Sequence, residues 1–314
     1  MQVRHLLSIA DLGRDHLSDL VSRGMQIAAR GSAAQNLEGK MVGIYFRGSS
    51  TRTRTSFTVG AHKLGADVIH YAPNDLQLVT GENVEDTGRV LSGYLDVLVV
   101  RTNDSPDEMR ALAAQGKMSI INAMSSEEHP TQAITDLISI REQFGRLQGL
   151  HVLYIGEGNN SAASLALAVA LTPGMQLTVV TPEGYGLAEN VLQQSQRFAK
   201  QHGASVEQHH CMNRLPKNVD VVYTTRWQTM GVPKADVNWR EKFEPYRVTQ
   251  SVMAQVSKPS GTIFLHDLPA IRGSEVVDEV LDGPQSLAFQ QARHKLTAAM
   301  AVLSWCAESN GNRS

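Results

Sequence analysis

The sequence has few cysteines, few aromatic residues and no excess of either charge, and these shortages exclude several classes of protein. Two cysteines, Cys211 and Cys306, among 314 residues are too few for a disulfide framework or a cysteine-rich metal site. The 29 basic and 31 acidic side chains nearly balance, which argues against nucleic acid as a partner. No apolar run reaches the roughly 20 residues of a membrane span, and no signal peptide is evident. We therefore expect a cytoplasmic protein with no membrane partner.

Two glycine patterns that would indicate nucleotides are also missing. The chain contains no G-x-x-x-x-G-K-[ST] segment, so any phosphate it binds is not held by a nucleotide P-loop. The segment GEGNNSAASL (156–165) is similar to a dinucleotide fingerprint, but Ser161 stands where the third glycine belongs. The sequence therefore gives no support to a nicotinamide or nucleotide cofactor.

Apolar β-prone runs alternate with segments of helical spacing, which predicts α/β architecture. Residues 11–30 have amphipathic spacing and indicate an opening helix. This alternation implies a parallel sheet covered by helices on both faces. The first half is expected to contain strands at 41–46, 67–72, 96–101 and 118–123, and helices from about 51 and at 83–95, 106–115 and 130–145.

The same rhythm restarts after a turn-rich stretch at 145–149, which predicts a second doubly wound domain. We place the boundary near residue 147, giving domains at 1–147 and 148–285, with a helix at 286–308 that packs back on the first domain. Residues 233–246 have no clear period and indicate a long loop beside a strand end, where ligands bind in such folds. Further strands are expected at 151–158, 176–182, 219–225 and 261–269, and helices at 161–171 and 188–202.

The run Ser50, Thr51, Arg52, Thr53, Arg54 directly follows the predicted strand at 41–46 and opens a predicted helix. The first turn of a helix presents unbonded backbone N–H groups and the positive end of the helix dipole. Hydroxyl and guanidinium groups there add donors and positive charge. The run therefore predicts a binding site for a phosphate group.

Two further strand ends carry polar side chains suited to a reacting group. Arg101 ends the apolar run DVLVV, and His129 and Gln132 stand at the start of the helix after the next strand. Since the carboxyl ends of parallel strands meet at one edge of a sheet, Arg52, Arg101 and His129 are expected to converge on one pocket.

The segment FRGSSTRTRTSF, together with HPTQ at 129–132, resembles the carbamoyl phosphate signature of the aspartate and ornithine carbamoyltransferases. The resemblance implies that an amine attacks the carbonyl carbon of carbamoyl phosphate, without a metal, a cofactor or a covalent intermediate. It assigns the phosphate to Ser50, Thr51, Arg52 and Thr53, the carbonyl oxygen to Thr53, Arg101 and His129, and the carbamoyl nitrogen to Gln132.

The second half resembles the ornithine-type enzymes. HDLPAIRGSEVVDEVLDG (266–283) is similar to their H-C-L-P loop, with Asp267 in place of the cysteine. The resemblance implies that backbone carbonyls of Asp267 and Leu268 accept bonds from the carbamoyl nitrogen and the attacking amine. It also places Lys295 where these enzymes have an arginine, and Asn160 where an asparagine binds the α-carboxylate of the acceptor.

The acceptor loop departs from both branches of the family. Thr225 stands where ornithine-type enzymes have an aspartate for the α-ammonium of the acceptor, and Asp267 is an alternative anion. Arg226 and Gln228 match the T-R-x-Q of aspartate-type enzymes, which bind a side-chain carboxylate. Thr229 and Met230 nearly preserve the S-M-G of ornithine-type enzymes, whereas Thr80 replaces the lysine that aspartate-type enzymes lend to a neighbouring subunit.

The resemblance therefore implies a carbamoyltransferase, expected to be a homotrimer, that acts on an ornithine-like or other diamino acid. Three alternatives stay open: an aspartate-type carbamoyltransferase, an inactive carbamoyl phosphate-binding relative that acts as a sensor, and a nucleotide or nicotinamide enzyme. The retention of Arg52, Arg101, His129 and Gln132 argues against the inactive relative.

Overall fold

The computed structural model describes residues 3–31, 34–228 and 233–308, which group into two compact units. One unit contains residues 1–138 and 294–314, and the other contains residues 139–293. Helices α5 (Pro130–Phe144) and α11 (Ala288–Ala307) each include one of the two points at which the chain passes between the units. The domain boundary near residue 147 stays a prediction.

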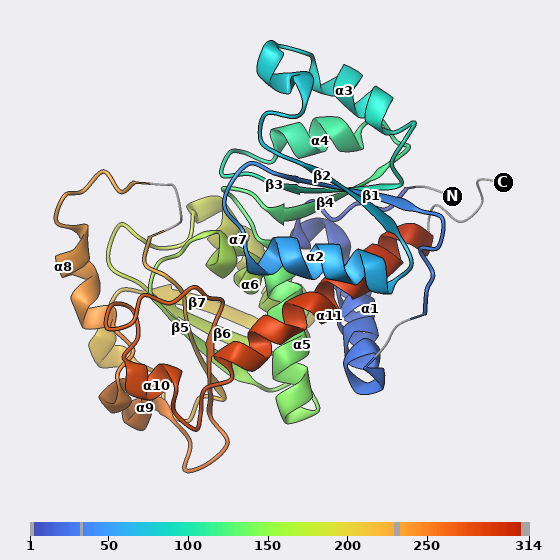
Figure 1. The fold of residues 1–314 in the computed structure, drawn as a ribbon. Helices are drawn as coiled ribbons and strands as arrows, with labels where there is room; N and C mark the ends of the chain where they lie inside the picture. Colours follow the sequence, from blue (N-terminus) through green and yellow to red (C-terminus); the bar gives the residue numbers. More distant parts are fainter. Residues whose placement is uncertain (1–2, 32–33, 229–232, 309–314) are drawn as a thin grey trace. The chain divides into compact units, whose positions relative to one another are not determined.

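The first unit is built on a parallel sheet in the order β2-β1-β3-β4 (Figure 1). In β3, Leu98 and Val100 pack with Met109 and Leu112 of α4, while the alternate residues of the strand are equally buried. Since successive side chains point to opposite faces, both faces must be covered. The strands are β1 (Met41–Phe46), β2 (Asp67–Tyr71), β3 (Val97–Arg101) and β4 (Ser119–Met124).

The helices of this unit begin and end at residues suited to those positions. Ser8 caps α1 by accepting a bond from the Ala10 N–H, and Gly31, at φ +66°, closes the helix with a bond from its N–H to the carbonyl of Ile27. In addition to α5 and α11, the unit contains α1 (Ile9–Arg30), α2 (Arg52–Lys63), the 3-10 helix η1 (Gln77–Thr80), α3 (Val84–Leu91) and α4 (Asp107–Ala113).

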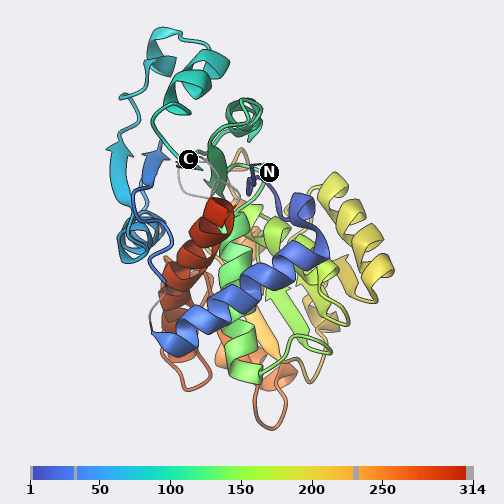
Figure 2. The same cartoon turned by 90° about the vertical axis from the view of Figure 1, so that its right-hand side faces the viewer.

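The C-terminal part of α11 packs on the first unit, as the sequence predicts. The ring of Trp305 lies 5.2 Å from the Arg4 guanidinium carbon and 5.4 Å from the ring of His16. Figure 2 shows α11 beside α1. A contact between residues about 300 positions apart ties the chain end to the domain that begins the chain.

The second unit is built on a five-stranded parallel sheet in the order β7-β6-β5-β8-β9. Leu153, Val222 and Phe264 pack on one face with Met253 and Val280, which lie in the short helices α9 and α10. The strands are β5 (His151–Ile155), β6 (Gln176–Val180), β7 (Ser205–His209), β8 (Val221–Thr224) and β9 (Ile263–His266). The helices are α6 (Asn160–Leu171), α7 (Glu189–His202), η2 (Met212–Arg214), α8 (Trp239–Phe243), η3 (Glu244–Tyr246), α9 (Gln250–Val256) and α10 (Asp278–Leu281).

The predicted fold class, two α/β domains with parallel sheets, is confirmed, but one prediction within it is wrong. The long loop expected at 233–246 contains α8 and η3. Trp239 and Phe243 lie four residues apart on α8, and Phe243 packs against both Trp239 and Trp227 in a small apolar cluster that stabilises this short helix. The predicted elements also do not include β7, α9 and α10.

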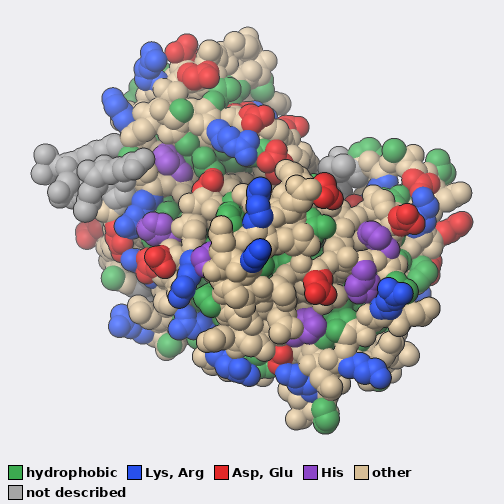
Figure 3. Space-filling view, turned by 180° about the vertical axis from the view of Figure 1, so that it is seen from behind, with side chains coloured by type: hydrophobic (Ala, Val, Ile, Leu, Met, Phe, Trp, Pro, Cys, Tyr) green, Lys and Arg blue, Asp and Glu red, His purple; other side chains and the backbone are tan. Residues whose placement is uncertain are grey.

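None of the helices in the described part of the chain combines the length and the apolar character that a membrane span requires. Figure 3 shows acidic and basic side chains interspersed on one face of the molecule. This mixture agrees with the near balance of charges in the sequence.

Candidate functional site

The carboxyl ends of three strands meet at one edge of the sheet in the first unit. Phe46 at the end of β1 is aligned with Arg101 at the end of β3, and Arg101 is aligned with Met124 at the end of β4. The Arg47 N–H donates to the carbonyl of Arg101 (3.0 Å), and the Thr102 N–H donates to the carbonyl of Met124 (2.9 Å). The loop that carries the predicted phosphate-binding residues, the end of β3 with Arg101 and the loop that carries His129 therefore start side by side. The chain reverses its strand order between β1 and β3, where ligands bind in such sheets.

The helix α2, which follows β1, starts without a side-chain cap. Thr51 at its N-cap makes no capping bond, and no acidic residue lies in its first turn. Thr53 is buried there, and Ser50 Oγ and Arg54 Nε are buried polar atoms with no hydrogen-bond partner among the described residues. Since buried polar groups are nearly always bonded in native proteins, these donors and the helix dipole favour an anion in this first turn.

Arg101 and His129 are both buried, with 6% and 5% of their surface exposed. Burial, and then the positive charges of Lys295 and Arg101, hold the pKa of His129 well below its usual 6.5. The imidazole is therefore neutral at physiological pH, and its Nδ1 lies 3.2 Å from the hydroxyl of Thr131. The electrostatic effects also show that α11 brings Lys295 close to the histidine, although the two residues are 166 positions apart.

Gln132, which is completely buried, has hydrogen bonds at both ends of its side-chain amide. Lys295 Nζ donates to its Oε1, and its Nε2 donates to Asp136 Oδ1 at 2.7 Å. These bonds fix the orientation of the amide. A carbonyl oxygen can accept two hydrogen bonds, so Oε1 keeps one lone pair for a further donor.

The loop that ends at His129 is anchored to the start of α1. Glu128 accepts hydrogen bonds from the hydroxyl of Ser8 and from the Ile9 N–H (3.1 Å). A carboxylate at a helix N-terminus is stabilised by the helix dipole. Nothing local in the sequence indicates this role of Glu128, because its partner Ser8 is 120 positions away.

We expect His129 to make folding stability depend on pH. Since its folded-state pKa is lowered, only the unfolded chain gains a proton at this residue as the pH falls through about 6.5, so acidification favours unfolding. Between pH 6.5 and 5.5 this residue should contribute a loss of about 1 kcal/mol. Urea denaturation of the wild type and of His129→Gln at several pH values measures the effect. The other histidines are common to both proteins, so parallel pH dependences would contradict this assignment.

The second unit has its predicted residues at the carboxyl ends of β5, β8 and β9, and its own strand order reverses between β5 and β8. Asn159 caps α6, and its Nδ2 donates to the hydroxyl of Thr225 at 2.9 Å. Asn160 is the first residue of α6 and is buried. The Thr225 hydroxyl in turn donates to the carbonyl of Arg226. Thr225 thus holds two loops together and brings no charge to the site.

The carboxylate of Asp267 accepts a hydrogen bond from the hydroxyl of Ser161 at 2.9 Å. Leu268 has a left-handed backbone, with φ +53°, which is rare for a residue with a side chain. The Leu268 N–H donates to Nδ1 of His266, whose Nε2 lies 3.2 Å from the buried carboxylate of Glu275. These bonds hold the loop in its strained form.

The remaining predicted acceptor residues lie in the segment after β8. Arg226 and Gln228 are half-buried, and Arg226 Nε is buried without a hydrogen-bond partner among the described residues. Thr229 and Met230 lie outside the described residues. Sequence reasoning missed two charged residues of this region, Glu157 and Lys234, which form an ion pair. Glu157 falls within GEGNN, but its partner is 77 residues away.

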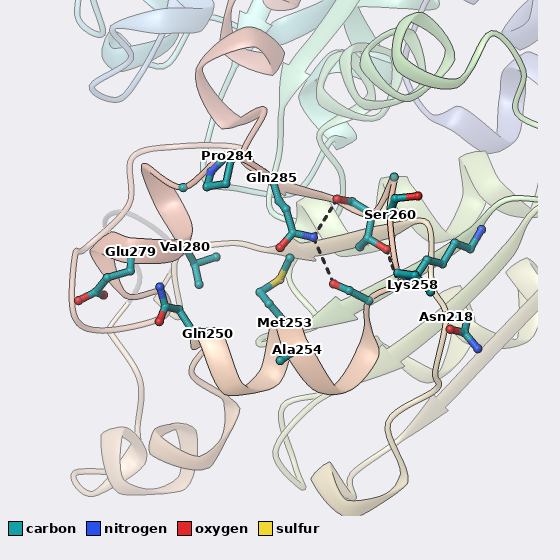
Figure 4. Close-up of a pocket in the computed structure, with 15 residues that line it drawn as sticks. Asn218, Gln250, Met253, Ala254, Lys258, Ser260, Glu279, Val280, Pro284 and Gln285 are labelled. Atoms are coloured by element: carbon teal, nitrogen blue, oxygen red, sulfur yellow. Dashed lines mark hydrogen bonds between the residues drawn. The ribbon is translucent and has the colours of Figure 1, made fainter.

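A cavity of about 720 Å³ lies elsewhere in the second unit (Figure 4). It is lined in part by Asn218, which precedes β8, and by Thr262, which precedes β9, where Gln285 Nε2 donates to the Thr262 carbonyl at 3.0 Å. These positions are at the amino ends of the strands. We therefore do not assign this cavity to the site at the carboxyl ends.

Comparison with family models divides the chain into two parts. Residues 4–142 match the model described as "Aspartate/ornithine carbamoyltransferase, carbamoyl-P binding domain". Residues 148–306 match the model described as "Aspartate/ornithine carbamoyltransferase, Asp/Orn binding domain". Together the matches cover nearly the whole sequence.

Individual relatives and solved structures give the same result. The ornithine carbamoyltransferase of Caldicellulosiruptor saccharolyticus is 40% identical over 304 residues, covering 96% of this chain and 97% of the relative. The enzyme of Methanobrevibacter smithii is 36% identical over 299 residues, covering 95% of this chain and 98% of the relative. Among solved structures, the ornithine carbamoyltransferase from Pyrococcus furiosus has a TM-score of 0.89 at 35% identity, with 96% of each chain covered. The enzyme from Gloeobacter violaceus has a TM-score of 0.85 at 36% identity, with 97% of this chain and 99% of the other covered.

Proposed function

The chain belongs to the aspartate/ornithine carbamoyltransferase family, and from this premise we propose that it transfers the carbamoyl group of carbamoyl phosphate to the side-chain amine of ornithine or a closely similar diamino acid. The products are a ureido amino acid and phosphate. The observation that carries the proposal is the grouping of His129, Arg101, Lys295 and Gln132 at the sheet edge from which α2 also starts.

The phosphate of the donor is assigned to Ser50, Thr51, Arg52 and Thr53. The first turn of α2 has no side-chain cap, and Ser50 Oγ and Arg54 Nε are buried donors that lack a partner within the described ranges, which supports this assignment. A dianionic phosphate would satisfy those donors and interact favourably with the helix dipole. The same contacts would stabilise the phosphate as it leaves.

The carbonyl oxygen of the donor is assigned to Thr53, Arg101 and His129. When the amine attacks the carbonyl carbon, negative charge grows on that oxygen, and donors that are already in position lower the barrier. His129 is neutral, so it would act as a hydrogen-bond donor and not as a cation. The bond between carbon and the phosphate oxygen then breaks, phosphate leaves with the electron pair, and it can take the proton of the amine.

The carbamoyl nitrogen is assigned to Gln132 and to the backbone carbonyls of Asp267 and Leu268. The bond from Lys295 polarises the Gln132 amide and fixes it, which leaves one lone pair of Oε1 for a carbamoyl N–H. On the acceptor side, Asn160, Thr225, Gln228 and Asp267 are assigned to the amino acid, together with Arg226.

An aspartate acceptor is the second candidate, because one observation favours it. The buried Nε of Arg226 has no partner among the described residues, and a guanidinium group at that position suits a carboxylate. A catalytically inactive sensor is the third candidate.

An acceptor screen at saturating carbamoyl phosphate tests the proposal. Phosphate release and ureido product should be measured with ornithine, 2,3-diaminopropionate, N-acylated ornithines, putrescine and aspartate. We expect the highest kcat/KM with ornithine or another free diamino acid. Preference for aspartate would establish the second candidate, and tight binding of carbamoyl phosphate without turnover would establish the sensor.

We also infer a homotrimer and a cytoplasmic location. The trimer is implied by the family, and the location is supported by Cys211 and Cys306, which are both described and both free thiols. Light scattering of the purified protein tests the trimer directly.

A further inference from the structure

Unpartnered polar atoms are concentrated at one place in the second unit. Among its described residues, four side-chain atoms are buried without a hydrogen-bond partner, and three of them, Glu157 Oε2, Arg226 Nε and Trp227 Nε1, follow the ends of β5 and β8. The fourth, Glu275 Oε2, lies in the loop after β9. Because such atoms are rare in native proteins, three together at a ligand-binding edge indicate that a ligand supplies their partners.

The three atoms belong to loops that touch one another. A Cβ placed on Gly156, the neighbour of Glu157, would lie only 3.9 Å from Trp227 Nε1. The Tyr154 hydroxyl donates to the carbonyl of Glu157 at 2.6 Å and lies 3.3 Å from the Thr225 hydroxyl. The loop after β5 and the loop after β8 are therefore in direct contact.

Lys234 fixes the orientation of Glu157. Its ammonium is paired with Glu157 Oε1 and lies between 4.8 and 5.3 Å from the ring centres of Tyr185, Trp239 and Phe243. The Lys234 side chain is only 8% exposed, so the carboxylate and the aromatic rings replace its lost hydration. One oxygen of Glu157 is thus engaged, and the other, Oε2, is available to a ligand.

The chemistry of the three atoms matches the head of an α-amino acid. Trp227 Nε1 and Arg226 Nε are donors, as a carboxylate requires, and Glu157 Oε2 is an acceptor on a charged group, as an ammonium requires. Thr225 cannot neutralise an ammonium, because its hydroxyl is uncharged and already bonded to Asn159 and Arg226. Glu157 supplies a carboxylate in the adjoining loop, and its backbone carbonyl accepts from the Tyr154 hydroxyl that also lies 3.3 Å from the Thr225 hydroxyl.

We propose that Glu157 and Trp227 bind the head group of the acceptor, with Glu157 Oε2 accepting from its α-ammonium and Trp227 Nε1 donating to its α-carboxylate. Lys234 is a positioning residue for Glu157. This inference rests on the proposed function. In it, the carboxylate of Glu157 supplies the negative charge that Thr225 lacks.

Two isosteric substitutions test the proposal. Trp227→Phe keeps an aromatic ring and removes only the indole N–H, and Glu157→Gln keeps the shape and removes the charge. We expect roughly tenfold and roughly 10- to 100-fold increases in the KM for ornithine, respectively, with the KM for carbamoyl phosphate unchanged. Trp305→Phe is the matched control, since Trp305 Nε1 is also buried without a partner among the described residues, but its ring packs against Arg4 and His16, which are assigned to neither substrate.

Two competitive ligands separate the roles. L-Norvaline carries both charges of the amino-acid head, and pentanoate carries only the carboxylate. Trp227→Phe should raise the inhibition constants of both compounds, whereas Glu157→Gln should raise that of norvaline and leave that of pentanoate unchanged. Circular dichroism and thermal unfolding establish that each variant is folded.

The outcomes distinguish this inference from the proposed function. If the wild type carbamoylates no amine, the proposed function is wrong. If the wild type is active and both folded variants keep the wild-type KM for ornithine, the function stands and this inference is overturned. In the Glu157→Gln protein, equal changes in the inhibition constants of norvaline and pentanoate would also overturn it. Such a result would indicate a general disturbance of the loop and not the loss of a contact with the ammonium. A misfolded Trp227→Phe protein would leave Glu157→Gln as the decisive variant.

Discussion

Replacing Arg52 by alanine is expected to raise the KM for carbamoyl phosphate by roughly 100-fold or more, which is the usual scale for losing one partner of a buried charged contact. Arg52 is the first residue of α2 and follows β1, at the sheet edge where the strand order reverses between β1 and β3. Its guanidinium would pair with the phosphate in both the ground state and the leaving state. Steady-state kinetics at varied carbamoyl phosphate, with the acceptor saturating, measures the effect.

Two controls accompany this prediction. Arg52→Lys keeps the charge but loses the planar fork, so an intermediate KM is expected. Lys63→Ala removes an exposed positive charge from the other end of the same helix and should leave the KM unchanged. Wild-type affinity in Arg52→Ala would remove this residue from the phosphate site.

Replacing His129 by alanine is expected to lower kcat by roughly 100- to 1,000-fold, the range found when one donor to a developing oxyanion is removed. His129 is buried beside Arg101 and Lys295 and is neutral, so its N–H can donate to the carbonyl oxygen without a change of protonation. The KM values should change much less than kcat, because the donor bond strengthens in the transition state. Initial rates with both substrates saturating give the result.

The control for this prediction is His62→Ala, which removes an exposed histidine from α2 and should leave kcat unchanged. The pH profile of kcat should also have the same shape near pH 6.5 in the wild type and in His129→Ala. The wild-type imidazole is already neutral there, so its titration does not contribute to the profile. A kcat close to that of the wild type would exclude His129 from the stabilisation of the transition state.

The sheets of both units could be predicted because their signals are local. The strand at 41–46 is bounded as expected, since its apolar β-prone residues are buried on both faces. The elements that were missed carry weak signals: β7 is a polar edge strand, SVEQH, and α9 is seven residues long. The helix α8 depends on an apolar cluster in which Phe243 contacts Trp227, and no local pattern reveals this contact.

The grouping of the residues assigned to the donor could be predicted further than that of the residues assigned to the acceptor, for a physical reason. Its residues stand directly at strand ends, so the parallel sheet alone brings Arg101 beside the loops that carry Arg52 and His129. The proposed acceptor site depends instead on long-range pairs such as Glu157 with Lys234. A charged pair of this kind has no characteristic spacing in the sequence, so only the folded structure identifies it.

The most direct test of the account is a crystal structure of the protein with phosphonoacetamide, a stable analogue in which a methylene group replaces the bridging oxygen of carbamoyl phosphate. We expect a phosphonate bonded to the first turn of α2 and to Arg52, with the amide oxygen beside Arg101 and His129 and the amide nitrogen beside Gln132. An analogue bound elsewhere, or a guanidinium of Arg52 that faces a different surface from the imidazole of His129, would contradict it.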